Sequence, residues 1–415
     1  MQKTKVFLFG LGKVLVKGAW YFGVLSFIRG RMLRRIVNNQ HPDHVLFVQL
    51  DNIGDVVFST GLLKKYRQSF PNKKIYFLGH IATKGLVEPY VDEAIYIERK
   101  KIESTVSYSV KVIARLKHIG FKTVIHLSTN QLSSVAYHEL WKRLNAREMV
   151  AYEGEQAFAK PRFWEVYEYV AIHSWWPRYK KYFTHVVKSV EVQSVKEHTH
   201  SSPHMLTSVF EHVAALSSYV LGEKVSAAEV MPVITTFDTV LSERYIVFGV
   251  GAAVDYRRWP IDRFADIAKK LIVNGYRIVL VGGKAEMALG ETMEQLLDHS
   301  PMLRNMIGKT SFIELLGLLK HASLVLSNET SFAHLAVGLG APSVCVLGGG
   351  HAGRCSHYGN MQRHAWVYDA EAVCLGDNWQ CGEGLPKGVP APCLDSVHVE
   401  SVWSAVGRIL TDKNA

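Results

Sequence analysis

The chain has 415 residues, which is long for one hydrophobic core and fits two domains of roughly 200 residues each. A hydrophobic fraction of 48% and a charged fraction of 20% describe a folded protein and exclude a disordered one. The formal net charge of +11 favours anionic partners, and since the sequence shows no Cys₂His₂ finger spacing and no aromatic RNA-binding strand, we expect lipid or glycan and no nucleic acid.

Residues 1–40 are expected to form a basic amphipathic N-terminal segment. Two lysines interrupt its apolar run, which disfavours a membrane span. Two interpretations stay open: a helix lying in a membrane interface, or a helix packed on its own domain. An interfacial helix would use aromatic anchors and a cluster of arginines, namely Trp20, Tyr21, Phe22, Phe27, Arg29, Arg31, Arg34 and Arg35.

Residues 41–235 are assigned to a first Rossmann-like domain. Apolar strands are expected at residues 45–50, 74–78, 95–97 and 123–127, with helices at 56–70 and 108–118. This alternation predicts a doubly wound parallel sheet. An aromatic-rich insertion at 141–182 is a helical insertion, a substrate-facing subdomain or part of the core. Three histidines beyond it, His198, His200 and His204, are expected in a solvated loop and not at a metal.

Residues 236–398 are assigned to a second Rossmann-like domain, after a linker near residues 231–243. Strands are expected at residues 245–250, 277–281, 323–326 and 343–347, and helices at 261–274, 285–297 and 312–320. The last segment, residues 399–415, is expected to form a helix that could cross back to the first domain.

The first motif, Asn52-Ile53-Gly54-Asp55, follows the first strand. Gly54 allows close backbone approach of a substrate. Asp55 lies at the start of a helix, where it either caps that helix or acts as a base. A helix N-terminus would keep the carboxylate ionised and able to accept a proton.

The second motif runs from Gly249 to Pro260. Its Gly249-x-Gly251 lacks the third glycine of a dinucleotide fingerprint, so NAD is not expected. Gly282 and Gly283, after the next strand, give a nucleotide room or simply form a tight turn. The sequence contains no Asp-x-Asp, so a diphosphate held by a chelated metal is not expected.

The third motif runs from Ser327 to Pro342 and reads as strand, loop, helix and strand. Thr330 and Ser331 stand at the helix start, where free N–H groups and the positive dipole end suit a phosphate. His334, one turn further, could reach the same anion as a cation or as a hydrogen-bond donor. An ordinary capped βα unit is the alternative.

These three motifs, in this order, resemble those of glycosyltransferase family 9, the heptosyltransferases. The family's third motif usually reads Asn-Asp-Thr-Gly-x-x-His, so Glu329 stands here for its Asp and Ser331 for its Gly, while Arg257 takes the place of a lysine in the second motif. The resemblance covers residues 45–406. It implies an α/β protein of GT-B fold, with two Rossmann-like domains facing across a cleft.

The resemblance also implies an inverting glycosyltransferase that moves a sugar, most often heptose from ADP-heptose, onto a lipopolysaccharide core or a related glycan. Asp55 would be the catalytic base, and neither a metal nor a cofactor would be required. The residues implied in donor binding are Arg257, Gly282, Gly283, Glu329, Thr330, Ser331, Phe332 and His334.

Two other functions stay open: a nucleotide-sugar epimerase or hydrolase of the same fold, and a non-catalytic membrane-associated scaffold. The odd number of cysteines, five, favours a reducing cytoplasm, with the protein peripheral on the inner face of a bacterial inner membrane. Cys374, Cys381 and Cys393 either bind a metal together with Asp377 or are merely local cysteines.

Overall fold

The computed structural model describes residues 24–128, 139–152, 182–188, 208–235, 244–355, 362–377, 379–382 and 384–411. Among the described helices, none is both long and apolar enough to cross a membrane. Several residues considered above lie outside the described ranges, namely Trp20, Tyr21, Phe22, most of the aromatic-rich insertion, His198, His200 and His204.

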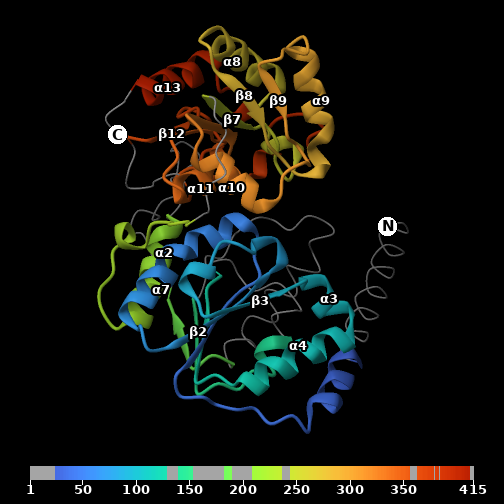
Figure 1. Ribbon diagram of the computed structural model, residues 1–415, viewed down its shortest axis with the longest axis vertical. Helices are drawn as coiled ribbons and strands as arrows, with labels where there is room; N and C mark the ends of the chain where they lie inside the picture. Colours follow the sequence, from blue (N-terminus) through green and yellow to red (C-terminus); the bar gives the residue numbers. More distant parts are fainter. Residues whose placement is uncertain are drawn as a thin grey trace, which may run out of the picture. The chain divides into compact units, whose positions relative to one another are not determined.

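The first sheet has six parallel strands in the order β3-β2-β1-β4-β5-β6 (Figure 1). Its central strand β1 reads HVLFVQ and is buried on both faces, which is typical of a strand inside a parallel sheet. Helices α3 (Arg99–Ser104) and α4 (Val106–Ile119) accompany it. The strands are β1 (His44–Gln49), β2 (Lys74–His80), β3 (Glu93–Ile97), β4 (Thr123–His126), β5 (Glu148–Tyr152) and β6 (His185–Val187).

The second sheet repeats this arrangement in the order β12-β11-β10-β7-β8-β9 (Figure 1). Counted from its first strand, the order is the 3-2-1-4-5-6 of the Rossmann fold, as it is in the first sheet. Helices α8 (Ile261–Val273), α9 (Met287–Leu296), α10 (Phe312–Lys320) and α11 (Ser331–Gly338) connect its strands. The strands are β7 (Tyr245–Gly249), β8 (Arg277–Leu280), β9 (Leu303–Asn305), β10 (Leu324–Asn328), β11 (Ser343–Val346) and β12 (His364–Val367).

Two parallel sheets, each with this strand order and with helices between the strands, confirm the predicted GT-B-like α/β class. The sequence missed short strands β5, β6, β9 and β12, of which β6 and β9 have only three residues each. Trp141 and Phe183, at the described ends of the aromatic-rich insertion, pack on each other with ring centroids 5.3 Å apart, in the core of the first sheet.

The two compact units of the chain do not follow chain order. One comprises residues 1–51, 70–82 and 91–189, and the other residues 52–69, 83–90 and 190–415. Helix α2 (Ile53–Ser69) belongs to the second unit, because it packs on α7 (Val209–Leu221) and on α11. Gly61 in α2 permits close approach of the chain that follows α7, since a side chain there would overlap the carbonyl groups of Val230 and Met231.

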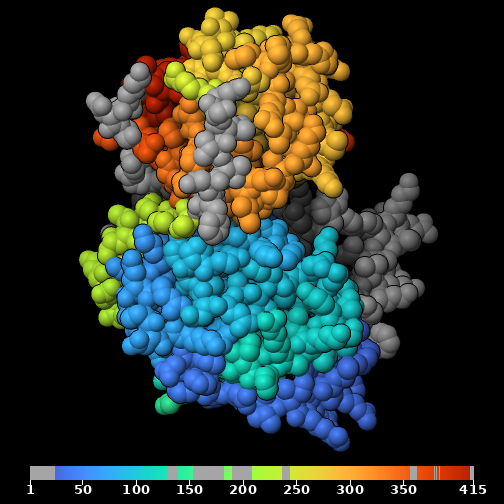
Figure 2. All heavy atoms as spheres, in the orientation of Figure 1, coloured from blue at the N-terminus to red at the C-terminus, as the bar shows by residue number. Residues whose placement is uncertain are grey.

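The last helix, α13 (Val399–Thr411), also belongs to the second unit and packs on β11, β12 and α8. Its apolar stripe, Val402, Val406 and Ile409, is buried in the core of the second sheet. This stripe therefore has its partners within the second unit, and the expected crossing of the last helix to the first domain stays a prediction. In Figure 2 its red atoms lie against the yellow and orange atoms of this unit.

Residues 24–33 form a helix that packs on its own unit through one inward stripe. The guanidinium of Arg29 is fully buried and donates to the hydroxyl of Ser109 at 2.7 Å and to the carbonyl oxygen of Ile102 at 2.9 Å. Leu33, one turn on, is buried as well. The side chains of Phe27 and Met32 are not part of this buried stripe and are 66% and 53% exposed.

Candidate active site

The carboxyl ends of β7 and β10 form the centre of the candidate site. The strand order reverses between these two strands, and ligands of open parallel sheets bind at such a switch point. Asn328 ends β10, and its amide nitrogen donates to the carbonyl oxygens of Val250 and Gly251 at 2.8 and 3.2 Å. Its amide oxygen accepts a hydrogen bond from the backbone N–H of Trp259 at 2.9 Å. Asn328 therefore fixes the loop after β7, which carries Arg257.

Glu329 follows Asn328, and two basic side chains hold its carboxylate. Oε2 accepts a hydrogen bond from Nη2 of Arg257 at 2.9 Å, and Oε1 lies 2.8 Å from Nδ1 of His351. Burial of Glu329 would raise the pKa of its carboxyl, but the charges of His351 and Arg257 outweigh burial and lower that pKa to about 2. Glu329 is therefore an ionised carboxylate at neutral pH.

Trp379 covers the same two basic residues. The Cζ atom of Arg257 lies 4.8 Å from the centroid of the Trp379 ring, and the ring of His351 meets it edge-on at 5.8 Å. Trp379 has a φ of 68°, in the left-handed region where a bulky side chain is strained. The carboxylate of Asp377 stabilises this loop, since it accepts from the backbone N–H groups of Trp379 and Cys381 at 2.8 Å each.

Several buried polar atoms at this site have no hydrogen-bond partner within the described part of the chain, among them Nε of Arg257 and Oγ1 of Thr330. Thr330 precedes α11 but its hydroxyl does not cap that helix. Unpaired buried donors are costly, and at a functional site they indicate a missing ligand. Together with the N-terminus of α11, which begins at Ser331 and carries the positive end of the helix dipole, they suit an anion.

His334 lies one turn into α11 and is buried. Burial is the main reason that the pKa of its imidazole is lowered to about 4, although the charge of Glu329 opposes the shift. The ring packs between Phe58 and Trp366, with centroids 4.8 and 6.2 Å away. Burial therefore favours the neutral imidazole, which can serve an anion as a hydrogen-bond donor, and the part of His334 in donor binding stays a prediction.

Asp55 stands in the first turn of α2, and its Oδ2 accepts a 3.3 Å hydrogen bond from the backbone N–H of Asn52. Its neighbour Gly54 faces α11, since a Cβ built on Gly54 would lie 3.2 Å from Cδ2 of His334. The pKa of the Cys355 thiol is raised by burial and, in addition, by the charges of Glu329 and Asp55. The structure thus brings Asp55 near the start of α11 within a single compact unit.

The glycines after β7 and β8 surround a second carboxylate. Glu286 accepts a hydrogen bond from the backbone N–H of Gly283 at 2.7 Å. A Cβ on Gly251 would overlap this carboxylate, and one on Gly282 would come within 2.6 Å of it. The ring of Phe332 packs on Gly249 at the end of β7 and the residue is 8% exposed, while its expected part in donor binding stays a prediction.

The sequence missed His351 and Glu286. His351 follows three glycines after β11, next to β10 in the sheet, and Glu286 follows β8, next to β7. Polar residues that follow the carboxyl ends of strands near the switch point are candidate ligand-binding residues because of their position alone. That rule could have found both residues, whereas a search for family motifs could not.

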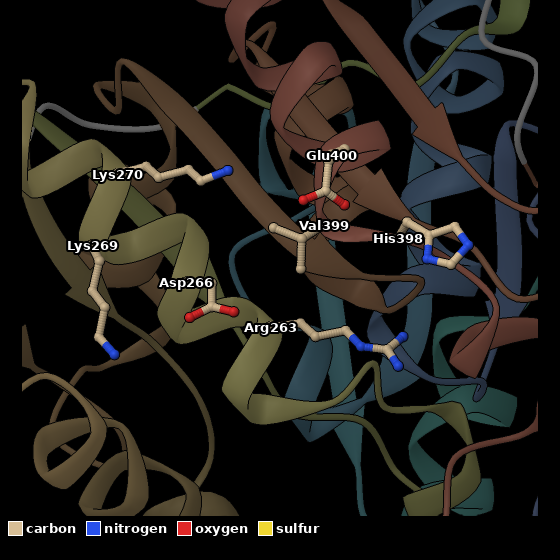
Figure 3. A pocket seen from close by; sticks show the side chains of 7 residues that line it. All are labelled: Arg263, Asp266, Lys269, Lys270, His398, Val399 and Glu400. Carbon is tan, nitrogen blue, oxygen red and sulfur yellow. The ribbon is translucent and has the colours of Figure 1, made fainter.

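Glu329, His334 and Cys355 place possible metal-ligand atoms within 4.8 Å of one another. Because the guanidinium of Arg257 already neutralises the only carboxylate of this group, we assign no metal to it. A surface pocket of about 440 Å³ lies elsewhere, between α8 and the start of α13 (Figure 3). It does not adjoin the strand ends, and its lining residues are Arg263, Asp266, Lys269, Lys270, His398, Val399 and Glu400.

Comparison with known proteins agrees with the motifs. Residues 187–380 match the family model described as glycosyltransferase family 9 (heptosyltransferase). Lipooligosaccharide heptosyltransferase 2 of Haemophilus influenzae is 28% identical over 142 residues, which cover 33% of this chain and 41% of that protein. Lipopolysaccharide heptosyltransferase 2 of Escherichia coli is 29% identical over 94 residues, 22% of this chain and 27% of the relative. The chain thus matches less than half the length of these relatives.

Solved structures resemble this one over a larger part of the chain. The glycosyltransferase family 9 protein from Veillonella parvula has a TM-score of 0.64 at 17% identity, covering 90% of this chain and 99% of that one. The ADP-heptose lipopolysaccharide heptosyltransferase II of E. coli has a TM-score of 0.60 at 17% identity, covering 90% and 100%. These likenesses concern the fold. The family model matches residues 187–380 of the 415-residue chain, and the three sequence motifs resemble the same family.

Proposed function

We propose that this protein is an inverting glycosyltransferase that moves heptose from ADP-heptose onto a lipopolysaccharide core or a related glycan. The observation that carries the proposal is the packing of α2 on α11. It brings the start of α2, with Asp55, near the start of α11, which carries the positive end of the helix dipole. A base and an anion site close together are what transfer from a sugar diphosphate requires. The names of the relatives, heptosyltransferases, support the choice of sugar.

The donor's diphosphate would bind at the N-terminus of α11. The hydroxyl of Thr330, the backbone of Ser331 and the unpaired Nε of Arg257 would donate to its oxygens, with His334 as a neutral neighbour. This arrangement supplies positive charge from the protein itself, so we expect turnover that does not need added Mg²⁺.

The nucleoside would lie over the glycines after β7 and β8. Gly282 and Gly283 leave room for a ribose, and the carboxylate of Glu286 would accept hydrogen bonds from its hydroxyls, as an acidic residue after the second strand does in many Rossmann folds. Glu329 would face the sugar hydroxyls. Since Arg257 and His351 already hold its carboxylate, its orientation is fixed before the donor binds.

In the proposed reaction Asp55 takes the proton from the acceptor hydroxyl. The resulting oxygen attacks the anomeric carbon from the face opposite the diphosphate, which leaves with the bonding electron pair. Arg257 and the start of α11 stabilise the charge that grows on the leaving phosphate. Groups placed to stabilise such developing charge are commonly worth about 3 kcal/mol each.

A reconstitution tests this function. The purified full chain is incubated with ADP-heptose and with a heptose-deficient lipopolysaccharide, and products are separated by mass. A glycan heavier by one heptose, formed only when the acceptor is present, supports the proposal. Free heptose or an epimerised donor, formed equally without acceptor, would favour an epimerase or hydrolase. Failure to bind any nucleotide sugar would favour a scaffold.

We further propose a cytoplasmic protein that is peripheral on a membrane surface. The exposed apolar side chains of Phe27, Met32 and Val37 alternate with exposed arginines in the described part of the N-terminal segment. Apolar anchors beside cations favour a surface of anionic lipid, where a lipid-linked acceptor would be found.

A further inference from the structure

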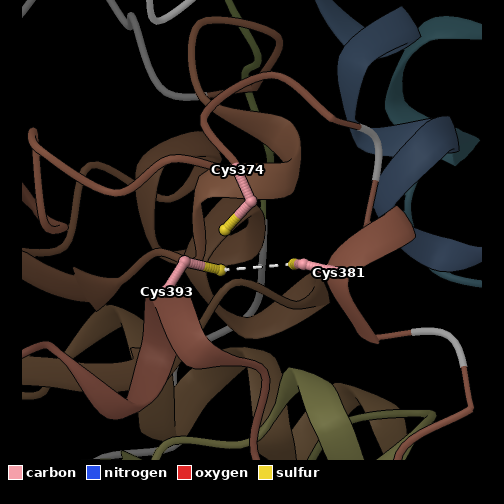
Figure 4. Close-up of side chains that lie close together, drawn as sticks. All are labelled: Cys374, Cys381 and Cys393. Atoms are coloured by element: carbon pink, nitrogen blue, oxygen red, sulfur yellow. Dashed lines mark hydrogen bonds between the residues drawn. The ribbon is translucent and has the colours of Figure 1, made fainter. Parts of the chain in front are cut away.

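Three cysteine side chains converge beside the candidate site (Figure 4). Their Sγ atoms all lie within 4.8 Å of one another, and the Sγ atoms of Cys381 and Cys393 are 3.8 Å apart. They come from three short segments: a turn at Cys374, a 3-10 turn at Gln380–Gly382 and helix α12 (Pro392–Asp395). Three thiols brought together from separate segments suggest a shared ligand.

The spacing suits a tetrahedral metal ion. Metal–sulfur bonds of about 2.3 Å at tetrahedral angles separate two sulfurs by about 3.8 Å, the distance observed for Cys381 and Cys393. A disulfide would need sulfurs about 2.05 Å apart and would leave the third thiol without a role. The structure holds all five cysteines as free thiols.

We propose that Cys374, Cys381 and Cys393 bind one soft divalent cation such as Zn²⁺ through three thiolates. Binding would release the thiol protons to solvent. Cys374 and Cys393 are buried, while Cys381 is partly exposed.

The groups around the thiols support this assignment. Both oxygens of Asp377 already accept backbone hydrogen bonds, one of them from Cys381, so Asp377 positions this cysteine and is not needed as a ligand. Cys345, by contrast, is a buried core cysteine on β11 that is not part of this cluster, and it provides a control.

The ion would stabilise the loop that places Trp379 on Arg257. Cys374 lies five residues before Trp379 and Cys381 two residues after it. One ion would therefore hold the chain in place both before and after this strained residue. Gly348 and Gly350 pack against the Trp379 ring so closely that a Cβ on either would collide with it. We infer a structural ion that holds Trp379 in place and takes no part in chemistry at the diphosphate.

Metal content tests the site directly. The full chain is purified without chelator, incubated with Zn²⁺, desalted and analysed for metal and protein. We expect one ion per chain, at least tenfold weaker Zn²⁺ binding for Cys381→Ser, and unchanged binding for Cys345→Ala. Less than one ion in ten chains of the unaltered protein, equal binding by Cys381→Ser, or a Cys381–Cys393 disulfide in the folded protein would each overturn the proposal.

Hydrogen exchange tests the link to Trp379. Removing the ion with a strong chelator should speed amide exchange at least tenfold in peptides covering residues 374–382. The same treatment of the Cys345→Ala variant should speed exchange in these peptides to the same extent. Unchanged exchange in a protein that has lost its ion would refute the structural role. Neither measurement requires glycosyl transfer, so a negative result here would leave the proposed function standing.

Discussion

The Cα atom of Gly54 faces the imidazole of His334 so closely that an added Cβ would lie 3.2 Å from Cδ2 of that ring. His334 has little room to give way, because Phe58 packs on one side of it and Trp366 lies on another. A glycine at this position of α2 thus allows the helix that carries Asp55 to approach α11.

Gly54→Ala should therefore fail to give the stabilisation that alanine normally brings to a helix, about 0.5–1 kcal/mol. Gly407→Ala in α13 is the matched control, since no atom lies within 4 Å of a Cβ built there. Thermal unfolding should show a higher melting temperature for Gly407→Ala and an equal or lower one for Gly54→Ala. A clear rise for Gly54→Ala would show that the contact is loose.

Asp55→Asn should reduce turnover by about 10²- to 10⁴-fold, the usual contribution of a general base. Asparagine caps helices about as well as aspartate, so the melting temperature and the affinity for the donor should hardly change. Steady-state kinetics with ADP-heptose and calorimetry check the two effects separately. Near-normal turnover would remove Asp55 from the mechanism, and a variant that unfolds would make Asp55 a structural residue.

Arg257→Ala should weaken nucleotide-sugar binding by about 1.5–3 kcal/mol, the typical loss for a charge-assisted hydrogen bond. The substitution would also remove one of the two basic side chains that contact the Glu329 carboxylate, so the pKa of Glu329 should rise. Titration calorimetry measures the binding. Arg263→Ala, which removes an α8 arginine paired with Asp395, should bind the donor normally. Equal losses in both variants would refute the assignment.

Stability should fall as the pH drops below about 6.5. The folded-state pKa of His334 is lowered to about 4, so below pH 6.5 the unfolded chain binds more protons than the folded one. At about 1.4 kcal/mol per pKa unit, this histidine alone costs about 2 kcal/mol between pH 7 and pH 5. Glu329, whose pKa is lowered to about 2, adds a further loss below pH 4.5. Urea unfolding of His334→Gln should show a flatter pH dependence in this window, and an unchanged slope would contradict the assignment.

Replacing Phe27 and Met32 together by serine should reduce sedimentation with anionic vesicles, and replacing Arg31, Arg34 and Arg35 by glutamine should do so in a salt-dependent way. Each arginine near such a surface is worth about 1 kcal/mol. Ile313→Ser, at a residue of α10 that is 51% exposed, is the control. Arg29 should be kept in all variants, because its buried hydrogen bonds hold the helix on its unit. Equal sedimentation of all variants would count against membrane binding.

Local sequence patterns predicted the fold well, because each central strand is a buried apolar run and each connecting helix has its own start and stop residues. Ser311, for example, caps α10 through a hydrogen bond from the backbone N–H of Glu314. Strand β9, Leu303–Asn305, could not be predicted in this way, since its three residues include one exposed and two half-buried side chains. Its pairing with β8 depends on the sheet and not on its own residues.

Those site residues that lie in the sequence motifs could be predicted from the sequence. Arg257 and Glu329 were both named from the sequence, but their ion pair joins residues 72 positions apart and requires the fold. The low pKa of His334 depends on burial, which a histidine near a helix start does not reveal. The roles of Asp55 and of the donor-binding residues stay predictions.

Because α2 and residues 83–90 cluster with the second unit, the chain cannot be divided at one point into two working halves. A fragment starting at residue 190 would contain the whole second sheet, yet it would lack α2 and would leave the faces of α7 and α11 without their partner. It would also lack Asp55. If the N-terminal part of the chain were exchanged between relatives by a single crossover near residue 190, α2 with Asp55 would come from one parent. The surfaces of α7 and α11 on which α2 packs would come from the other parent.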